Sequence, residues 1–451
     1  MNFSLNGFYR YFKGGSNAGK QDVRDSNQGT KKKIEFKKRS DYADFCFSDV
    51  HNPYIEAVIK EVIANSVGGN GIQVTPQPLD DNGDVDVVLQ KQLIKLWKDN
   101  KDHLDVGGRH KWAALNQIIA RELFAGGEVF LIKCISTEIV NQVSFGVMVK
   151  GYQAVPFENK NGYLDGVKCN FFGKAESYLF ANGDKPKAVT ASNVIHAANY
   201  TRSDDTRGYS ALAPACVKAV EVDDYDKDSS KLVSAAMRMV YFIVSKDKPE
   251  FPTGVPIVHI KGKKDEIDIK SLSSQLVNVY SKEHRKNLYR VMCASVGTGF
   301  GAVSGEFDGS YSASRQEVIT AAQKDLARQC KVIDDAIKPL YEAFVLRCIT
   351  SGLIKATTGN VFNARYVAPK RDHIDPLKQA KAVALELATN QTSLSDVLSS
   401  KGKDFDTYII HLRDELRKLE EAGLQPNGIE ALKYLELKIL EDEEEPASSN
   451  A

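Results

Sequence analysis

The sequence has no apolar run that could serve as a membrane span. A span needs about 18 or more consecutive apolar residues, and no window of the 451 residues approaches that length. The amino terminus also lacks the apolar core followed by small residues that marks a secretory signal. We therefore expect a protein without a membrane partner, made in the cytosol, whose final place is an assembly built there.

Residues that form metal, redox or nucleophilic sites are few and scattered. The seven cysteines include no CxxC pair, and the eight histidines include no HExxH or HxH spacing. These absences argue against zinc, dithiol and metalloprotease centres, and no GxSxG motif indicates a serine nucleophile. We predict reduced cysteines that lie mostly in the core, histidines on the surface or at helix caps, no cofactor and no catalytic residue.

Neither sign of charge dominates. The chain carries 60 Lys and Arg against 59 Asp and Glu, a formal net charge of +1. A protein that grips nucleic acid by its overall field is strongly basic, so that class is excluded, whereas a passive path for DNA is compatible. Only residues 1–40 are locally basic, with ten Lys or Arg against three Asp or Glu. We expect them to be a flexible arm.

The remaining pattern mixes helices and strands, which predicts an α+β fold; the length suits about three domains. Apolar residues at helical spacing favour helices over 55–63, 86–97 and 112–123, each followed by a glycine-rich or polar break. Strand-like runs follow. They cover residues 128–134, 143–150, 162–169 and 175–180.

A long helix with a polar middle is predicted from Ser210–Pro214 to about Met237. The acids of its middle are Glu221, Asp223, Asp224, Asp226 and Asp228. A helix with so few apolar residues in its middle cannot pack inside one domain. We therefore expect this helix to project from the domain or to line a water-filled space. Two short strands interrupted by prolines follow within 239–261, and a helix returns over 271–292.

The clearest helix is predicted over 314–351, with Ser314 and Glu317 at the spacing of a capping box and a kink at Pro339. Its apolar residues form a nearly unbroken stripe. They are Ile319, Ala322, Leu326, Cys330, Ile333, Ile337, Leu340, Phe344 and Cys348. Further helical stripes occur over 405–419 and 432–439, and the acidic tail 441–445 is expected to be disordered.

Three segments resemble chemical motifs but fail in context. Residues 14–20 (GGSNAGK) lack the Ser or Thr and the strand of a phosphate loop. Residues 297–301 (GTGFG) lack the βαβ frame of a dinucleotide site, so a helix-ending turn is predicted. Residues 80–84 (DDNGD) lack the closing Glu of a calcium loop, so a turn is predicted there too.

Read in order, six blocks resemble the lambda-type phage portal protein family, and together they cover about residues 50–425. They are residues 67–72 (VGGNGI), 112–130 (WAALNQIIARELFAGGEVF), 165–178 (DGV and GKAESY), 194–214 (VIHA and RGYSALAP), 304–315 (SGEF and YSASR) and 366–380 (YVAP and DPLKQA). The chain departs from the family at 297–301, at His196, where two histidines are usual, and at Glu306, where Asp is usual.

The resemblance implies a portal fold assembled as a ring of about twelve subunits around a DNA channel at one capsid vertex. Its parts would map as follows. The wing would be 41–210 plus 300–365, the stem helices 211–238 and 271–299, the clip 239–270, the tunnel loop 366–376 and the crown 377–440.

Three groups of site residues follow from this map as hypotheses. In the tunnel loop, Lys370, Arg371 and His373 would face DNA phosphate, because ring symmetry turns each cation into a belt of charge. In the first stem helix, Glu221, Asp224 and Asp228 would line the channel and repel phosphate. In the clip, the edge-strand residues that neighbouring subunits or docking proteins would contact are Phe251, Val255, Ile257 and His259.

The implied partners are double-stranded DNA read without sequence specificity, the terminase large subunit, a head-completion or adaptor protein, and the major capsid and scaffold proteins. The expected location is the virion. Two other hypotheses remain open at this point. The protein could be a cytosolic α+β enzyme with an unrecognised site, or another ring-forming connector component such as an adaptor, although adaptors are generally much shorter than this chain.

Overall fold

The computed structural model describes most of the chain between residues 36 and 421. The described residues are 36–48, 52–135, 143–157, 159–182, 186–238, 241–245, 257–261, 282–307, 311–355, 359–369, 376–400 and isolated positions from 405 to 421. The chain divides into two compact units, Met1–Tyr366 and Val367–Ala451. Residues 1–35 of the arm predicted over 1–40, the stripe at 432–439 and the acidic tail lie outside the described residues. The predicted end of the arm is wrong, because the Phe36 ring stacks on Tyr42 and a helix begins at Arg39.

The first helices form where apolar periodicity and capping residues agree. Helix α1 spans Arg39–Cys46 and α2 spans Pro53–Ser66. Asn52 begins α2, because its side-chain oxygen accepts hydrogen bonds from the next backbone N–H groups and proline suits the first turn. Gly68 and Gly71 follow with positive φ. The helix predicted over 55–63 and its glycine-rich end are confirmed.

Two more predicted helices, α3 (Val87–Asn100) and α4 (Trp112–Arg121), bury tryptophans against each other. The rings of Trp97 and Trp112 meet edge to face at 5.1 Å between centroids, and the Trp112 indole N–H donates to the carbonyl of Ile72. The turn at 80–84 is also confirmed, because the Asp80 carboxylate accepts from the backbone N–H groups of residues 82 and 84.

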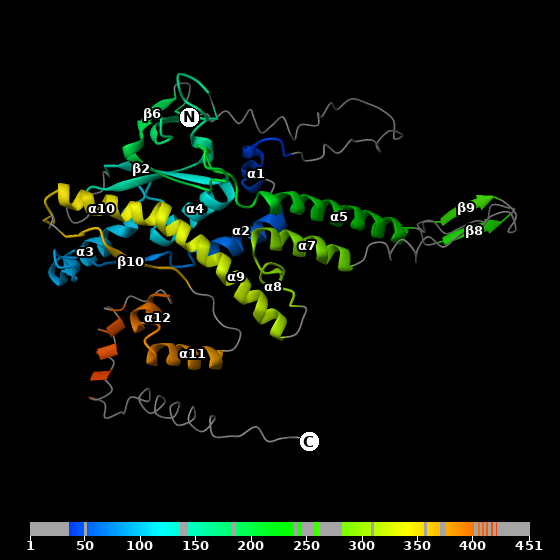
Figure 1. The fold of residues 1–451 in the computed structure, drawn as a ribbon. Helices are drawn as coiled ribbons and strands as arrows, with labels where there is room; N and C mark the ends of the chain where they lie inside the picture. Colours follow the sequence, from blue (N-terminus) through cyan, green and yellow to red (C-terminus); the bar gives the residue numbers. More distant parts are fainter. Residues whose placement is uncertain are drawn as a thin grey trace. The chain divides into compact units, whose positions relative to one another are not determined.

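Two three-stranded antiparallel sheets follow in unit 1 (Figure 1). The first has the order β3-β2-β7, with β2 in the centre, and the second has the order β4-β5-β6. The strands are β2 (Glu128–Cys134), β3 (Gly146–Gly151), β4 (Val167–Cys169), β5 (Ala175–Phe180), β6 (Lys187–Thr190) and β7 (Val194–Ala198). A separate pair joins β1 (Gln73–Pro76) to β10 (Ala364–Val367).

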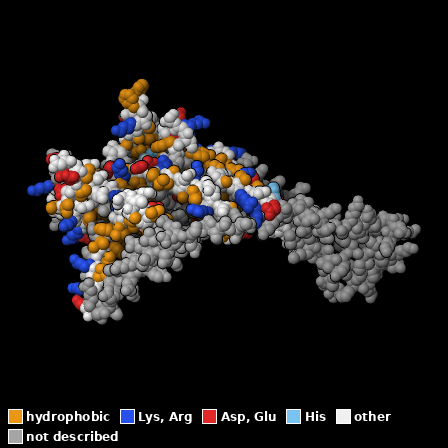
Figure 2. Space-filling model, turned by 60° about the horizontal axis from the view of Figure 1, so that its bottom comes forward, with side chains coloured by type: hydrophobic (Ala, Val, Ile, Leu, Met, Phe, Trp, Pro, Cys, Tyr) orange, Lys and Arg blue, Asp and Glu red, His pale blue; other side chains and the backbone are white. Residues whose placement is uncertain are grey.

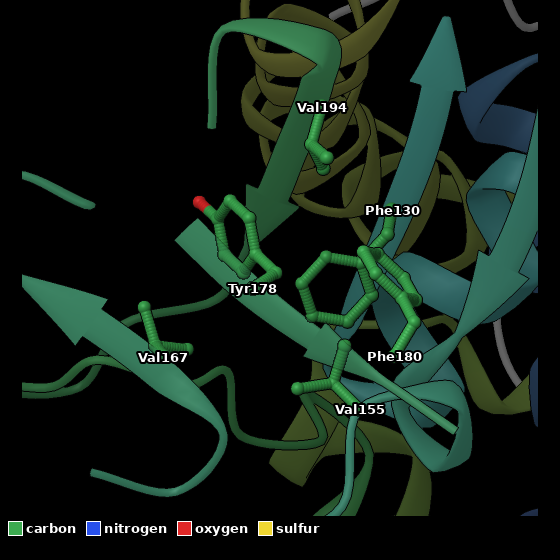
Figure 3. Close-up of a cluster of buried hydrophobic side chains, with 6 residues drawn as sticks. All are labelled: Phe130, Val155, Val167, Tyr178, Phe180 and Val194. Atoms are coloured by element: carbon green, nitrogen blue, oxygen red, sulfur yellow. The ribbon is translucent and has the colours of Figure 1, made fainter. Parts of the chain in front are cut away.

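A buried cluster joins residues of the two sheets (Figure 3). Its members are Phe130, Val155, Val167, Tyr178, Phe180 and Val194. Phe130 on β2 meets Tyr178 and Phe180 on β5 edge to face, at 5.5 and 5.6 Å between ring centroids. Packing of aromatic edges on faces contributes beyond the area it buries, so this cluster fixes β5 against the central strand.

The predicted helix over 314–351 is present, but its start and its faces differ from the prediction. It consists of α9 (Tyr311–Val332), a π turn η6 (Ile333–Ile337) and α10 (Lys338–Thr350). The capping-box interpretation of Ser314 is wrong, because the helix begins three residues earlier. Glu317 instead accepts a hydrogen bond from the backbone N–H of Gly301.

The π turn changes which side of this helix the apolar stripe occupies. After it, Ile337, Leu340, Phe344 and Cys348 are buried. Before it, the stripe positions 319, 326 and 330 are exposed, and the buried face is formed by positions 321, 325 and 332. A π turn accommodates one additional residue, which rotates all later side chains by about 100° relative to an uninterrupted α-helix. The predicted apolar stripe therefore lies mostly on the exposed side of α9 and on the buried side of α10.

Helices α5 and α7 pack side by side (Figure 1), and two short strands lie between them in the sequence. Helix α5 spans Ala213–Arg238, which confirms the predicted helix and places Pro214 in its first turn, and α7 spans Lys282–Val296 beside it. Strands β8 (Tyr241–Ser245) and β9 (Ile257–Lys261) pair with each other in parallel.

The remaining elements are short. Gly297, with positive φ, ends α7, and the next N–H groups bond back to carbonyls of its last turn, so the GTGFG segment is the predicted helix-ending turn. Helix α8 spans Phe300–Ser304. The 3-10 turns are η1 (Lys101–His103), η3 (Tyr152–Ala154) and η4 (Ala191–Asn193). Unit 2 contains α11 (Pro376–Ala388) and α12 (Leu394–Ser400).

Candidate functional site

Helices α5 and α7 are held together by an ion pair between the middle of α5 and the first turn of α7. The Arg285 guanidinium on α7 donates two hydrogen bonds to the Asp226 carboxylate on α5. The Nε–Oδ1 distance is 2.8 Å and the Nη2–Oδ2 distance is 3.0 Å. The hydroxyl of Tyr54, on α2, donates to the same carboxylate. The bonds to Asp226 raise the pKa of Arg285. Bidentate geometry fixes orientation as well as distance, so α2, α5 and α7 meet here in a defined arrangement.

The acids predicted to line a channel are mostly matched by lysines on the same helix. Lys218 Nζ lies 2.7 Å from Glu221 Oε2, and Lys231 Nζ lies 3.1 Å from Asp228 Oδ1. Lys227 pairs with Asp223. Exposed pairs of this spacing contribute little stability, but each lysine offsets the negative charge of the acid it pairs with. A channel-lining role for Glu221, Asp224 and Asp228 stays a prediction.

A buried charged junction lies where the chain enters α5. The carboxylate of Glu128, the first residue of β2, and the side chain of Arg207 are both fully buried. Arg207 Nε donates to Glu128 Oε1 at 2.8 Å, and the backbone N–H of Gly208 donates to Oε2 at 2.9 Å. His196 Nε2, on β7, lies 3.0 Å from Oε2. We call Glu128, His196, Arg207 and Gly208 the junction.

The rest of the Arg207 side chain is also satisfied. Nη1 donates to the carbonyl of Asp165 at 2.6 Å and Nη2 to that of Tyr152 at 3.0 Å, while the guanidinium lies 4.0 Å from the ring centroid of Phe157. Burial alone would raise the pKa of Glu128, but the bond to His196 and the charge of Arg207 hold it below its ordinary value. The buried carboxylate is therefore ionised, and its partners compensate the lost hydration.

Two glycines let the backbone approach this closely. A Cβ on Gly208 would lie 2.1 Å from the carbonyl oxygen of Gly127, and a Cβ on Gly127, whose φ is +92°, would lie 2.6 Å from the backbone of Tyr209. Both contacts are with backbone, which cannot move aside as a flexible side chain can. The dipeptide Gly127-Glu128 at the start of β2 and the dipeptide Arg207-Gly208 ahead of α5 are thus in direct contact with each other.

The junction was missed by reasoning from the residues. The prediction that every histidine lies on the surface or at a cap is wrong for His196, which is buried against Glu128 and stacked on Phe130 at 4.3 Å. The only sequence signal for the junction was that residues 127–128 and residues 207–208 both lie in blocks that resemble one family. By contrast, the prediction that the cysteines lie mostly in the core is confirmed for Cys46, Cys216, Cys293 and Cys348, whereas Cys134 and Cys169 are partly buried and Cys330 is exposed.

Glu122 is a second strongly perturbed carboxyl in this region, and it yields a pH prediction. It begins a π turn (Glu122–Gly126) and lies against Gly126 and Gly151. Burial raises the pKa of Glu122 from 4.5 to about 7, although the charge of Arg121 opposes the shift. The folded state therefore favours the protonated form. Because the pKa of Glu122 is higher in the folded than in the unfolded protein, protonated Glu122 makes its full contribution to folding stability below pH 4.5. That contribution is lost as the pH rises through about 7.

We expect Glu122→Gln to stabilise the protein by about 3 kcal/mol at pH 8 and by almost nothing at pH 4, since one pKa unit corresponds to about 1.4 kcal/mol. Urea unfolding of both proteins across this range measures the difference. Glu176→Gln, at an exposed carboxylate, is the control and should show no such trend. A stabilisation that is constant with pH would contradict the burial of a charge at Glu122.

Several predicted site residues lie outside the described part of the chain. The tunnel-loop cations Lys370, Arg371 and His373 do, and so do Phe251 and Val255. Ile257 and His259 lie in β9, where the backbone is paired with Tyr241 and Ile243 of β8. The roles of all these residues remain predictions.

Side chains of different charge and hydropathy are mixed on the described surface. Figure 2 shows basic, acidic and hydrophobic side chains interspersed over the described part of one face. Among the described residues, no group of His, Cys, Asp and Glu is arranged to hold a metal ion. In the same part of the chain, no helix has the length and hydropathy required to cross a bilayer.

Comparison with known proteins gives one family match. The family model described as "Phage portal protein, lambda family" matches residues 48–329, more than half of the chain. This region contains the junction and both helices α5 and α7. No curated protein matches the chain.

Solved structures of virus-like particles resemble the chain at low identity. A chain of the "virion of native gene transfer agent (GTA) particle" is 11% identical, with a TM-score of 0.44, over 82% of this chain and 94% of that chain. A chain from the neck of an empty GTA particle is 12% identical, with a TM-score of 0.43, over 80% and 94%. A neck chain of the native particle is 12% identical, with a TM-score of 0.39, over 78% and 91%.

Proposed function

Because the chain belongs to the lambda family of phage portal proteins, we propose that it forms a ring at one vertex of a virion capsid, through which double-stranded DNA is packaged, retained and ejected. The family match over residues 48–329 carries this proposal. The polar outer surface of α5 supports it, since a helix of this length with paired charges suits a wall facing water better than a core.

The parts of the ring are proposed to follow the sequence map. Residues 41–210 and 300–365 form the wing, α5 and α7 belong to the stem (211–238 and 271–299), and β8 and β9 to the clip (239–270). Residues 366–376 form the tunnel loop and 377–440 the crown. The two-stranded clip keeps an outer edge on each strand, which a neighbouring subunit, the terminase large subunit or a head-completion protein can pair with. Capsid and scaffold proteins are the proposed partners during assembly in the host cytoplasm.

Electron microscopy of the purified full-length protein tests the ring directly. We expect rings of about twelve subunits with a central hole, and no binding of ATP by the protein alone. A stable monomer in light scattering, with α5 protected from hydrogen exchange along its whole length, would contradict the proposal and favour an enzyme or another class of protein.

The tunnel-loop cations yield a prediction about DNA retention. Replacing Lys370 and Arg371 by alanine removes two phosphate contacts per subunit, and ring symmetry multiplies that loss. We expect the fraction of DNA-filled heads to fall several-fold, with rings still forming. The control replaces two exposed lysines of the β4–β5 hairpin, Lys168 and Lys174, by alanine. Equal retention by both double variants would remove the proposed role.

The α5 acids yield a prediction about DNA passage. Asp224→Lys with Asp228→Lys adds cations to the proposed channel wall, and each added phosphate contact increases friction on moving DNA. We expect packaging yield to drop several-fold while ring assembly is kept. The control is Asp84→Lys with Glu176→Lys, exposed carboxylates outside α5. Unchanged packaging by the α5 variant would place these acids away from the channel.

A further inference from the structure

Two buried cysteines from distant parts of the chain face each other. Cys46, the last residue of α1, and Cys216, in the first turn of α5, are both buried. Their Sγ atoms are 3.5 Å apart, although 170 positions separate the two residues in the sequence. Because the sulfurs of a disulfide bond lie about 2.0 Å apart, these two would have to approach each other by only about 1.5 Å. Side-chain rotation covers such a distance without unfolding either helix.

Both thiols are reduced in the structure, and hydrogen bonds hold them in place. The Cys216 thiol donates to the carbonyl of Tyr42, on α1, at 3.9 Å, and its sulfur is also in contact with the Cys46 thiol. The hydrogen bond with Cys46 and burial raise the pKa of Cys216 well above its ordinary value. Since the thiolate is the reactive form of cysteine, we expect the pair to oxidise slowly at neutral pH.

Helix α1 packs against the start of α5 and the residues just before it (Figure 1). The Arg39 side chain pairs with Asp205 and donates to the carbonyl of Arg207 at 3.2 Å. The rings of Tyr42 and Tyr209 lie 5.5 Å apart between centroids. These contacts hold α1 on the segment that leads from the junction into α5. A covalent bond between the two cysteines would therefore fix α1 to the base of α5.

We propose that Cys46 and Cys216 form a disulfide bond within one chain after the protein leaves the reducing cytosol. The inference rests on the proposed function, because a virion component passes from the cytosol, where thiols are kept reduced, into the oxidising surroundings of a released particle. A disulfide restricts the unfolded chain more strongly when it closes a longer loop. A bond across 170 positions therefore stabilises the subunit in the particle after release.

A peroxide is the oxidant that suits so buried a pair, because hydrogen peroxide is nearly as small as water. One thiol takes an oxygen atom from the peroxide and becomes a sulfenic acid, and one water leaves. The second thiol then attacks the sulfenic sulfur, the S–S bond forms, and the sulfenic hydroxyl leaves with the thiol proton as a second water. The two thiols lose two electrons in total, and the peroxide is reduced to two waters. Access requires only local opening of α1, a helix of 8 residues.

Peptide mapping of the purified full-length protein tests whether the bond forms. The protein is treated with hydrogen peroxide, unfolded, alkylated and digested without reduction, and we expect a linked peptide pair that contains residues 46 and 216. On a non-reducing denaturing gel the closed loop should make the chain migrate faster. Cys46→Ala should abolish the faster band, whereas Cys330→Ala, which removes an exposed thiol, should retain it. If both cysteines are still alkylated when Cys330 is fully oxidised, the inference is overturned.

Thermal unfolding and harvested particles test the role of the bond. The oxidised protein should melt about 5 °C higher than the reduced protein, and dithiothreitol should remove the difference; equal melting temperatures would overturn the stabilising role. Particles alkylated at release should carry the bond, and particles alkylated inside unlysed cells should not. A bond that forms in the purified protein but is absent from released particles would overturn this inference and leave the proposed function intact. Particles that lack the chain altogether would overturn the proposed function, and with it the premise of the inference.

Discussion

Replacing Arg207 by methionine is expected to lower the free energy of unfolding by about 3–5 kcal/mol, the range for removing one partner of a buried ion pair. Methionine keeps much of the volume, so the loss comes from charge. The Glu128 carboxylate would stay buried, with its contacts to His196 and the Gly208 N–H but without the guanidinium that neutralises it. Urea unfolding at neutral pH measures the change.

A matched pair elsewhere in the chain isolates the effect of burial. Arg121 reaches Glu56 at 2.9 Å, but both side chains are partly exposed, so Arg121→Met should cost at most about 1 kcal/mol. Adding Glu128→Gln to Arg207→Met should recover part of the loss, because the unpaired charge is then removed. An equal loss of unfolding free energy in Arg207→Met and Arg121→Met would show that burial does not increase the contribution of the Glu128–Arg207 pair to stability.

Replacing Gly208 by alanine is expected to lower the free energy of unfolding by at least about 3 kcal/mol. The new Cβ would lie 2.1 Å from the Gly127 carbonyl oxygen and 2.9 Å from the Glu128 Cβ. Relief requires the backbone before α5 to move away from β2. That movement would also stretch the bond from the Gly208 N–H to Glu128.

Gly69→Ala is the control for the methyl group itself. Nothing lies within 4 Å of a Cβ at Gly69, and its φ is not in the positive region, so alanine should be neutral or slightly stabilising there. Thermal unfolding followed by circular dichroism distinguishes the two variants. Gly208→Ala should also reduce ring yield if the junction sets the direction of α5. A Gly208→Ala protein as stable as Gly69→Ala would show that the backbones are not in close contact.

Local signals were sufficient for most of the elements. Helix α2 was predictable because periodicity, a proline in the first turn and a glycine break agree within 20 residues, and α5 was predictable from its first turn. The errors occur where local patterns compete with packing. Ser314 and Glu317 have the spacing of a cap, yet they lie inside a helix that begins at Tyr311, and Glu317 bonds to Gly301 instead.

The junction could not be predicted because its members are far apart in sequence and individually ordinary. Glu128 and Arg207 are 79 residues apart, and one carboxylate among 59 acids carries no mark of burial. What brings them together is the antiparallel pairing of β2 with β7 and the return of the chain past Gly127. Such information lies in tertiary packing, not in periodicity or spacing.

The five residues Ile333–Ile337 have a further effect on how this long helix can vary. Because they turn one series of apolar positions from the outside to the inside, substitutions at the series positions 319, 326 and 330 alter the surface, and substitutions at positions 337, 340, 344 and 348 alter the core. Surface and interior, which share a single sequence pattern, are thereby free to diverge separately.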